Sequence, residues 1–237
     1  MACVLITRPA EDAAPLRAHL EQMGLGVITA PMLHIKNIPG PALSLDGVQG
    51  FLLTSANGVR ALATRTESRD RVVFAVGDAT AREARACGFR DVHSADGDVD
   101  DLARLVIKSC DPGAGALLHA AGSAQAGDLT GTLERAGYTV RRDVLYQAVP
   151  VDSLPAETLE ALKSEALDGV LVYSPRTARL FESLISDAGL VPALARLKLF
   201  ALSRNVNEAA TQVWGQRIIA ERPDQESLLH SVRTCYY

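Results

Sequence analysis

Residues 51–62 read FLLTSANGVRAL, and residues 170–181 read VLVYSPRTARLF. In each stretch an apolar run ends at a serine, Ser55 or Ser174, that a second hydroxyl-bearing residue precedes, and an amphipathic run follows. An apolar run that ends at serine before a helical pattern predicts a buried β-strand leading into a capped α-helix. The chain is therefore expected to build the same strand-to-helix turn twice.

Short apolar runs alternate with amphipathic stretches along the chain. Most runs are continuously apolar, as expected for strands that helices cover on both faces, and the alternation predicts parallel α/β sheets. Gly24, Gly137 and Gly189 follow helical patterns at the places where a left-handed C-terminal cap belongs. The apolar runs span residues 4–7, 26–30, 51–55, 72–77, 91–95, 116–122, 139–149, 170–174, 197–203 and 217–221.

The order of these runs contains an internal repeat. Four blocks of sequence recur in the same order, with offsets that drift slowly along the chain. Two similar five-stranded units are the expected result. The matched pairs, with their offsets in residues, are Leu5 and Leu117 (112), Ser55 and Ser174 (119), Phe74 and Phe200 (126), and Ala95 and Ala220 (125).

Two extended, proline-bearing stretches, residues 32–45 and 143–155, are predicted to connect the units. If both cross over, the first strand-helix-strand belongs with the last third of the chain, and the middle is an inserted domain. Two such connectors can pair as a two-stranded β linker and leave a cleft between the lobes. The predicted boundaries are 1–35 and 151–237 for domain 1, 40–145 for domain 2, and 36–39 and 146–150 for the linkers.

Composition narrows the class of protein. The 237 residues carry a net charge of −4, which argues against general binding to nucleic acid. The four cysteines are scattered without a C-x-x-C pair, as expected for reduced thiols in the cytoplasm. The first residues lack a signal-peptide pattern, and no apolar run approaches the length of a membrane span. A cytoplasmic protein with no membrane partner is expected.

Candidate ligand-binding groups gather at the predicted carboxyl ends of the strands, where helix N-termini present free N–H groups. Arg8 and Arg176 are placed to bind a carboxylate or phosphate, although each could equally be a surface ion pair. Tyr146 ends a strand, where its phenol would face the cleft or pack in the hinge. His119 is interpreted more simply as a half-buried strand histidine. The hydroxyl-bearing candidates, each of which could be a plain N-cap, include Thr54, Ser55, Thr80 and Ser174.

Several chemistries find no support in the sequence. The five histidines have no H-x-x-x-H spacing and no cysteine neighbour, which argues against a metal site. There is no G-x-S-x-G elbow, no G-x-G-x-x-G turn and no P-loop. The residues alone therefore predict a two-lobed α/β binder of an anionic ligand that uses no cofactor.

The pattern resembles uroporphyrinogen-III synthase. The motifs that carry the resemblance are VLITRPAEDAAPLRAHLEQMGLGVITAPML, FLLTSANGVRAL, FAVGDATAREARACGF, VLYQAVP and VLVYSPRTARLF. The resemblance implies two flavodoxin-like domains and a monomeric, cofactor-independent lyase of heme biosynthesis. This lyase would cyclise hydroxymethylbilane to uroporphyrinogen III, with inversion of ring D and loss of water. The small-molecule bilane is then the expected partner, which leaves room for transient contact with the preceding pathway enzyme.

The resemblance also implies roles for single residues. Tyr146 matches a tyrosine that helps the hydroxyl group leave. Where the family often has a Gly-Pro-Thr-Thr turn, residues 203–206 read Ser-Arg-Asn-Val, so that Asn205 replaces a hydroxyl donor. The expected substrate-binding residues are Arg8, Thr54, Ser55, Thr80, Ser174, Arg176 and Asn205.

The sequence is compatible with two other classes of function. A two-lobed, non-catalytic binding or sensor module for an anionic metabolite would use the same turns without turnover. A nucleotide-dependent α/β enzyme is disfavoured by the missing phosphate loops.

Overall fold

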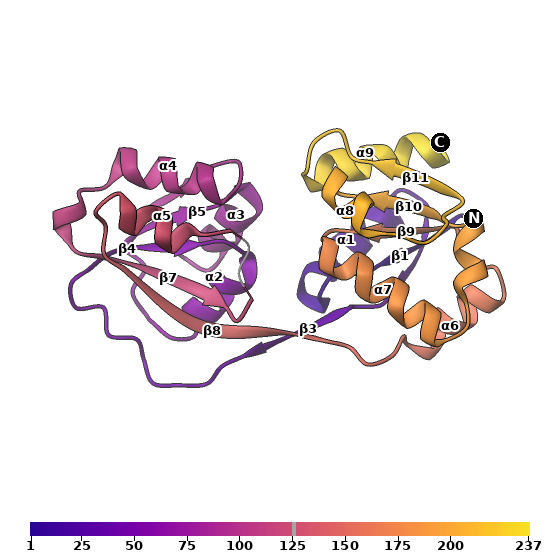
Figure 1. Ribbon diagram of the computed structural model, residues 1–237, viewed down its shortest axis with the longest axis horizontal. Coiled ribbons are helices and arrows are strands. Elements are labelled where there is room, and N and C mark those ends of the chain that lie inside the picture. Colours follow the sequence, from indigo (N-terminus) through magenta and orange to yellow (C-terminus); the bar gives the residue numbers. More distant parts are fainter. Residues whose placement is uncertain (125–126) are drawn as a thin grey trace. The chain divides into compact units, whose positions relative to one another are not determined.

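The computed structural model describes residues 1–124 and 127–237, which form two compact units (Figure 1). Unit 1 comprises Met1–His34 and Val149–Tyr237, so it is assembled from both ends of the chain. Unit 2 comprises Ile35–Ala148 and is continuous in sequence.

Unit 1 is built on a five-stranded parallel sheet with the spatial order β2-β1-β9-β10-β11. Its strands are β1 (Cys3–Ile6), β2 (Gly26–Thr29), β9 (Gly169–Val172), β10 (Lys198–Ala201) and β11 (Gln216–Ile219). Its helices are α1 (Ala10–Gln22), α6 (Ala156–Lys163), α7 (Pro175–Asp187), the 3₁₀ helix η2 (Val191–Arg196), α8 (Arg204–Ala209) and α9 (Gln225–Tyr236).

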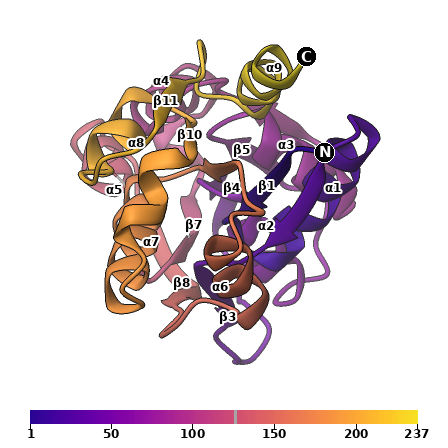
Figure 2. The same cartoon turned by 90° about the vertical axis from the view of Figure 1, so that its right-hand side faces the viewer.

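Helices cover both faces of this sheet, because its strands are apolar on both sides. Side chains of α1 and α9, such as Leu16 and Leu228, pack against one face. Helices α6, α7 and α8 cover the other face (Figure 2), where side chains such as Leu162, Phe181 and Val206 pack in the core. Burial of large aliphatic and aromatic side chains at about 1.5–3 kcal/mol each is the main term that stabilises the unit.

Unit 2 is built on a six-stranded sheet with the order β3-β8-β7-β4-β5-β6, although the first two residues of β3 and the last two of β8 belong to unit 1. Its pairs from β8 to β6 are parallel. The strands are β3 (Leu33–Asn37), β4 (Val48–Leu53), β5 (Val72–Ala75), β6 (Val92–Ser94), β7 (Ala116–Gly122) and β8 (Val140–Pro150). The helices are α2 (Ala56–Ala63), α3 (Asp78–Ala86), α4 (Val99–Ser109), the 3₁₀ helix η1 (Pro112–Ala114) and α5 (Leu129–Arg135).

The core of unit 2 likewise lies on both faces of its sheet. Phe51 of β4 meets Phe89 edge-to-face at 5.9 Å between ring centroids, in a cluster that also contains side chains of α2. On the other face, Leu117 and Phe74 pack against side chains of α4 and α5. Both strand faces are therefore dry, which explains why the strand sequences read as continuous apolar runs.

The internal repeat of the sequence reappears as one topology used twice. The order β2-β1-β9-β10-β11 in unit 1 corresponds to β8-β7-β4-β5-β6 in unit 2, with the repeat pairing β1 with β7 and β9 with β4. The two units thus share a strand order but differ in connectivity, because their corresponding strands follow one another differently along the chain. The predicted parallel α/β architecture is confirmed.

The predicted helix ends also agree with the structure. Gly24, Gly137 and Gly189 have φ values of 76°, 90° and 70°. This left-handed conformation is one that glycine adopts at little cost, and it ends α1, α5 and α7.

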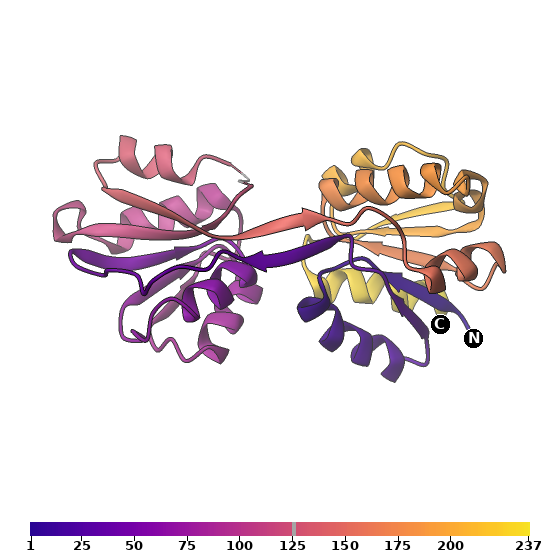
Figure 3. The ribbon, with the colours of Figure 1, turned by 90° about the horizontal axis from the view of Figure 1, so that it is seen from below.

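Strand β8 is long and uninterrupted. Of its eleven residues, those from Val140 to Tyr146 pair with β7, and the strand continues beside β3, as Figure 3 shows. The Ile38 backbone N–H donates to the Leu145 carbonyl at 2.8 Å, which ties the end of the β3 segment to β8. The predicted linker 146–150 is thus the continuation of a strand, with no break after residue 145.

Candidate functional site

The turn after β4 is a capped helix start. The Ser55 backbone is extended, and its Oγ accepts a hydrogen bond from the Gly58 N–H at 3.0 Å. Such a cap stabilises a helix by about 1 kcal/mol because it satisfies one of the free N–H groups of the first turn. The capping predicted for Ser55 is therefore present, and the other N–H groups of the first turn of α2 stay available to a ligand.

Tyr146 joins this turn from a distant part of the sequence. Its phenolic oxygen lies 2.8 Å from Ser55 Oγ, across 91 residues of chain. The β7–β8 register shifts between Ala121 and Gly122, so that Gly122 pairs with Tyr146. The tyrosine is half-buried, and the Ser123 N–H donates to its carbonyl at 3.0 Å. Thr54, Ser55 and Tyr146 are thus brought together at the carboxyl ends of β4 and β7.

Gly122 belongs to the candidate site, although it is not among the expected substrate-binding residues. A Cβ atom at this position would lie 2.7 Å from Cζ of the Tyr146 ring, closer than two carbon atoms pack. The Arg142 guanidinium donates to the Gly122 carbonyl at 2.7 Å and holds the strand end in place. The absence of a side chain at Gly122 therefore makes room for the tyrosine. The signal in the sequence was the glycine that ends the apolar run 116–122.

His119 stands behind Thr54. It is 3% exposed, deeper than the half-buried position expected, and its Nε2 lies 3.5 Å from Thr54 Oγ1. Burial, with a smaller contribution from the positive charge of Arg142, lowers the pKa of His119 to about 4. The imidazole is therefore neutral at neutral pH. A cavity of about 20 Å³ lies beside the pair, lined by Thr54, His119, Ala121, Gly122, Ala124, Gly127 and Leu129.

The turn after β9 in unit 1 repeats the serine cap. Ser174 Oγ accepts from the Thr177 N–H at 3.1 Å and lies 2.8 Å from Thr177 Oγ1. Pro175 occupies the first helical position, where its missing N–H costs nothing. Arg176 is exposed in the same first turn.

The remaining predicted residues lie on other turns. Thr80 is in the first turn of α3 and is 5% exposed. Asn205 is exposed in α8, just after the Ser203 cap, whose Oγ accepts from the Val206 N–H at 3.4 Å. These residues stand near the carboxyl ends of β5 and β10, beside the strands that carry the two repeated turns.

Arg8 has partners within unit 1. Its guanidinium contacts Asp12 at 3.1 Å and Gln225 at 3.0 Å, and it lies 4.6 Å from the centre of the Tyr173 ring. Burial raises the pKa of the Tyr173 phenol well above its usual value. An anion at Arg8 must therefore compete with the Asp12 carboxylate.

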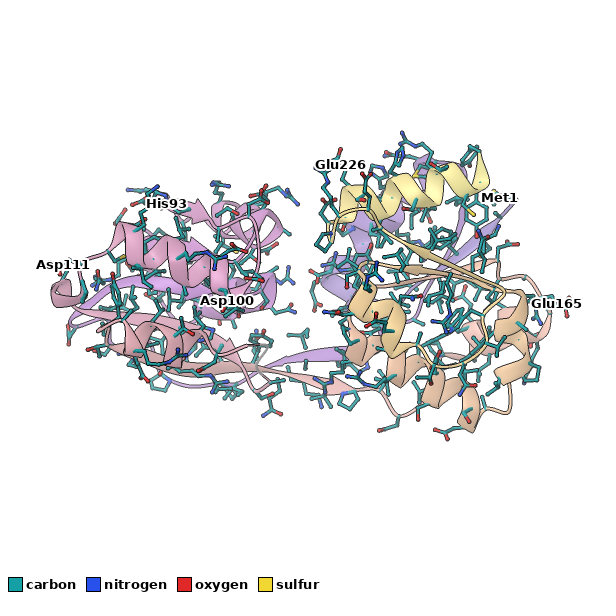
Figure 4. The ribbon with its side chains drawn as sticks, turned by 45° about the horizontal axis from the view of Figure 1, so that its top comes forward. Met1, His93, Asp100, Asp111, Glu165 and Glu226 are labelled. Atoms are coloured by element: carbon teal, nitrogen blue, oxygen red, sulfur yellow. The ribbon has the colours of Figure 1, made fainter. Side chains whose placement is uncertain are left out.

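Charge distinguishes the helix N-termini from one another. The first turns of α2 and α7, both within the described residues, contain no acidic side chain. Helix α4 instead has Asp98 as its cap with Asp100 in its first turn, and α9 has Asp224 as its cap with Glu226 in its first turn (Figure 4). Because a helix N-terminus attracts negative charge, the acidic turns are already neutralised. The repeated turns, like the serine-capped first turn of α8, contain no acidic side chain and are suited to an external anion.

Other kinds of site receive no support from the described residues. Within 1–124 and 127–237 there is no group of three or more His, Cys, Asp or Glu side chains arranged to hold a metal ion. Over the same residues no helix is both long and apolar enough to cross a membrane.

Comparisons with known proteins agree with this geometry. The family model described as "Uroporphyrinogen-III synthase HemD" matches residues 14–230. A uroporphyrinogen-III synthase from Chlorobaculum parvum is 25% identical over 228 residues, which cover 86% of this chain and 89% of that protein.

Two solved structures share the fold. The uroporphyrinogen-III synthetase of Helicobacter pylori superposes with a TM-score of 0.64 at 13% identity, covering 99% of this chain and all of that one. A mutant uroporphyrinogen III synthase of Thermus thermophilus gives 0.59 at 20% identity, covering 99% and 98%. Since the family model matches nearly the whole chain, the protein belongs to the uroporphyrinogen-III synthase family.

Proposed function

We propose that this chain cyclises hydroxymethylbilane to uroporphyrinogen III, with inversion of ring D and loss of water. The observation that carries the proposal is the pair of serine-capped, acid-free helix N-termini on α2 and α7, in a chain of this family. A linear tetrapyrrole rich in carboxylates suits such N-termini, because each offers free N–H groups and a positive dipole end.

Tyr146 is the proposed catalytic residue. A phenol held 2.8 Å from Ser55 Oγ has a defined orientation and can donate a hydrogen bond to the departing hydroxyl group of the bilane. The reaction breaks the C–O bond of the hydroxymethyl group, forms two carbon–carbon bonds and breaks one as ring D inverts, and releases one water molecule with no net change of oxidation state. It therefore needs no electron acceptor, and we propose that no cofactor takes part.

The other predicted residues are proposed to hold the substrate. Thr54 and Ser55 would bind carboxylates at α2, and Ser174 with Arg176 would do so at α7. Arg8, Thr80 and Asn205 are proposed as further contacts, with Arg8 exchanging Asp12 for a substrate carboxylate. Restraint of the flexible bilane would supply much of the rate and the isomer selectivity, because the free bilane closes to isomer I by itself.

The setting of the reaction is also part of the proposal. We propose a monomer that works in the cytoplasm, with the bilane as its partner and brief contact with the enzyme that supplies it. Size-exclusion chromatography with light scattering tests the monomer directly. A stable dimer at micromolar concentration would contradict it.

Isomer analysis tests the function. Purified protein is given fresh hydroxymethylbilane, and the oxidised product is resolved into isomers I and III. The synthase predicts isomer III formed faster than spontaneous closure. Isomer I alone, at the uncatalysed rate, would reject the proposal. If ligand-induced stabilisation accompanied that result, it would favour the binding or sensor module, which the family match does not favour.

A further inference from the structure

His119 and Thr54 form a buried pair that the proposed mechanism does not yet use. They stand on neighbouring parallel strands, since His119 of β7 pairs with Leu52 of β4 and Thr54 lies two residues further along. Their side chains meet with Nε2 at 3.5 Å from Oγ1. The histidine is 3% exposed, whereas the threonine is only partly buried. The pair thus links the core of unit 2 to a hydroxyl at the candidate site.

The hydrogen-bond partners of the two ring nitrogens indicate which nitrogen of His119 carries the proton. A neutral imidazole has one N–H donor and one bare nitrogen acceptor. Nδ1 of His119 is buried and has no hydrogen-bond partner among the described residues. A buried N–H without a partner is rarer in proteins than an acceptor with an unused lone pair. The arrangement with the proton on Nε2 leaves the bare nitrogen at Nδ1 and is therefore favoured.

We infer that His119 is a positioning residue whose Nε2–H donates to Thr54 Oγ1, so that the Thr54 hydroxyl proton points to an anionic ligand. A hydroxyl that accepts from Nε2–H keeps its own proton for a second partner. Thr54 therefore acts as a donor, the role that binding a carboxylate requires. That the ligand is a carboxylate of the bilane rests on the proposed function.

The surroundings of the pair suit this role. The 3.5 Å separation is longer than a strong N–H···O bond. A threonine hydroxyl that donates to an anion becomes a better acceptor, so a bound carboxylate would strengthen the contact with His119. The cavity of about 20 Å³ beside both side chains has room for roughly one water-sized group.

A double-mutant cycle tests the inference. The variants are His119→Leu, Thr54→Val, the double variant and the conservative His119→Gln, whose amide N–H can replace Nε2–H. We expect His119→Leu and Thr54→Val each to raise KM for hydroxymethylbilane about fivefold, the effect of one hydrogen bond. The double variant should resemble Thr54→Val alone, and His119→Gln should recover most of the affinity. Changes in kcat should be smaller than those in KM.

The alternatives give different results. If His119 only fills the core, the losses in His119→Leu and Thr54→Val multiply in the double variant, and His119→Gln is no better than His119→Leu. Either result overturns the inference. If wild-type protein forms no isomer III, the proposed function fails instead, and the tautomer must be measured directly.

Nitrogen-15 NMR of the imidazole gives that measurement without turnover. The wild-type spectrum at pH 7 should show a protonated Nε2 and a bare Nδ1 for His119, assigned by its loss in His119→Gln. A proton on Nδ1 would reverse the direction of the hydrogen bond and overturn the inference, whatever the activity. The NMR spectrum of the wild-type protein also tests the inference if His119→Leu fails to fold.

Discussion

The turns after β4 and β9 share a sequence pattern and a serine cap, but their serines have different neighbours. Ser174 Oγ meets Thr177, three residues along its own helix. Ser55 Oγ meets the phenol of Tyr146, which another strand delivers. The local sequence thus determines the cap in both units, whereas a distant residue gives the turn of unit 2 a group able to exchange protons. Binding is a function that both turns can perform, and chemistry is proposed at one.

The first strands of the two repeats differ in a similar way. The offset of 112 residues that relates Leu5 to Leu117 also relates Thr7 to His119. Thr7 is 1% exposed, and its hydroxyl donates to the Leu171 carbonyl at 2.7 Å, so its hydrogen bonding is complete inside the sheet. His119 instead reaches toward Thr54 beside a cavity. In unit 1 this side chain donates to a main-chain carbonyl within the sheet, whereas in unit 2 it contacts Thr54 of the candidate site.

The largest expected difference between the two units is in how their stability depends on pH, because only unit 2 has a buried histidine at this position. The pKa of His119 is about 4 in the folded protein and near 6.5 in an unfolded chain, so between these values the unfolded state binds more protons. The free energy of unfolding should therefore fall as the pH drops from 6.5 to 4. The loss attributable to His119 is about 3 kcal/mol. Hydrogen exchange of β7 peptides at several pH values would measure it locally.

His119→Gln is the matched control for this pH effect, because it is uncharged throughout. The difference in unfolding free energy between wild type and variant should grow below pH 6.5 and level off near pH 4. Among the described residues, Arg142 is the charged group that acts on His119, and Thr54 and apolar residues line the cavity beside it. A difference that does not change with pH would show that His119 is not buried as a neutral base.

Loss of the Tyr146 hydroxyl should remove the group that distinguishes the turn after β4 from the turn after β9. Tyr146→Phe keeps the ring against Gly122 but deletes the hydroxyl at Ser55. We expect kcat to fall about a hundredfold with residual isomer III formation, because general acid assistance is lost while restraint of the bilane persists.

Tyr138→Phe is the control for this change. Tyr138 is another buried tyrosine of unit 2, and its hydroxyl donates to the Cys110 carbonyl at 2.8 Å, away from the site residues. It should lose some stability and no activity. Unchanged turnover in Tyr146→Phe would remove Tyr146 from the mechanism, and complete loss with intact folding would contradict the role given to restraint.

A methyl group at Gly122 should misplace the tyrosine without altering it. Gly122→Ala would bring Cβ to 2.7 Å from the ring, so the ring or the strand end must move. We expect about a tenfold loss of kcat, since overpacking of this kind costs roughly 1–3 kcal/mol. In Gly113→Ala the nearest atom to the new Cβ is 3.4 Å away, and this control should retain full activity. Equal rates for both variants would show that the position of Tyr146 is unimportant.

Removal of each serine should give the smallest effects and the most direct comparison. Ser55→Ala and Ser174→Ala should each lower the unfolding free energy by about 1 kcal/mol through loss of a cap. Ser55→Ala should also reduce kcat severalfold, because the Tyr146 phenol loses its hydrogen-bond partner. Of the two kinetic constants, Ser174→Ala should change only KM.

Asp98→Ala provides the reference for these two variants. It deletes the cap of α4, whose first turn is acidic, so stability should fall with KM and kcat unchanged. Steady-state kinetics and urea unfolding of all three variants separate capping from binding. Identical kinetic profiles for Ser55→Ala and Ser174→Ala would break the distinction between the two turns.

Much of this architecture could be predicted because it depends on local or periodic signals. The repeat predicts two similar units, and the caps at Ser55 and Ser174 follow from residue type and position. Glycines that end helices are equally local. Such features depend on a few neighbouring residues, which one sequence displays in full.

The contacts that give the site its chemistry are not local. Ser55 and Tyr146 are 91 residues apart, and Arg8 reaches Gln225 across 217. The sequence predicts Arg8 as a ligand contact but could not reveal its contact with Tyr173, which lies on a distant strand end; only its partner Asp12, four residues along, is local. The depth of His119 likewise depends on strands and helices packing around it. Chain distance therefore limits prediction of the site more than of the fold.

Unit 1 is discontinuous in sequence, and this affects how it can fold during synthesis. Strand β1 sits inside its sheet and pairs with β9, whose residues follow more than 160 positions later. During synthesis, residues 1–34 therefore cannot complete their sheet until Val149–Tyr237 have emerged from the ribosome. All residues of unit 2 emerge earlier, so unit 2 can fold first. The apolar segment Cys3–Ile6 is exposed to non-native pairing during that interval. Nascent chains stalled before β9 should accordingly bind chaperones through their first strand, with unit 2 already folded.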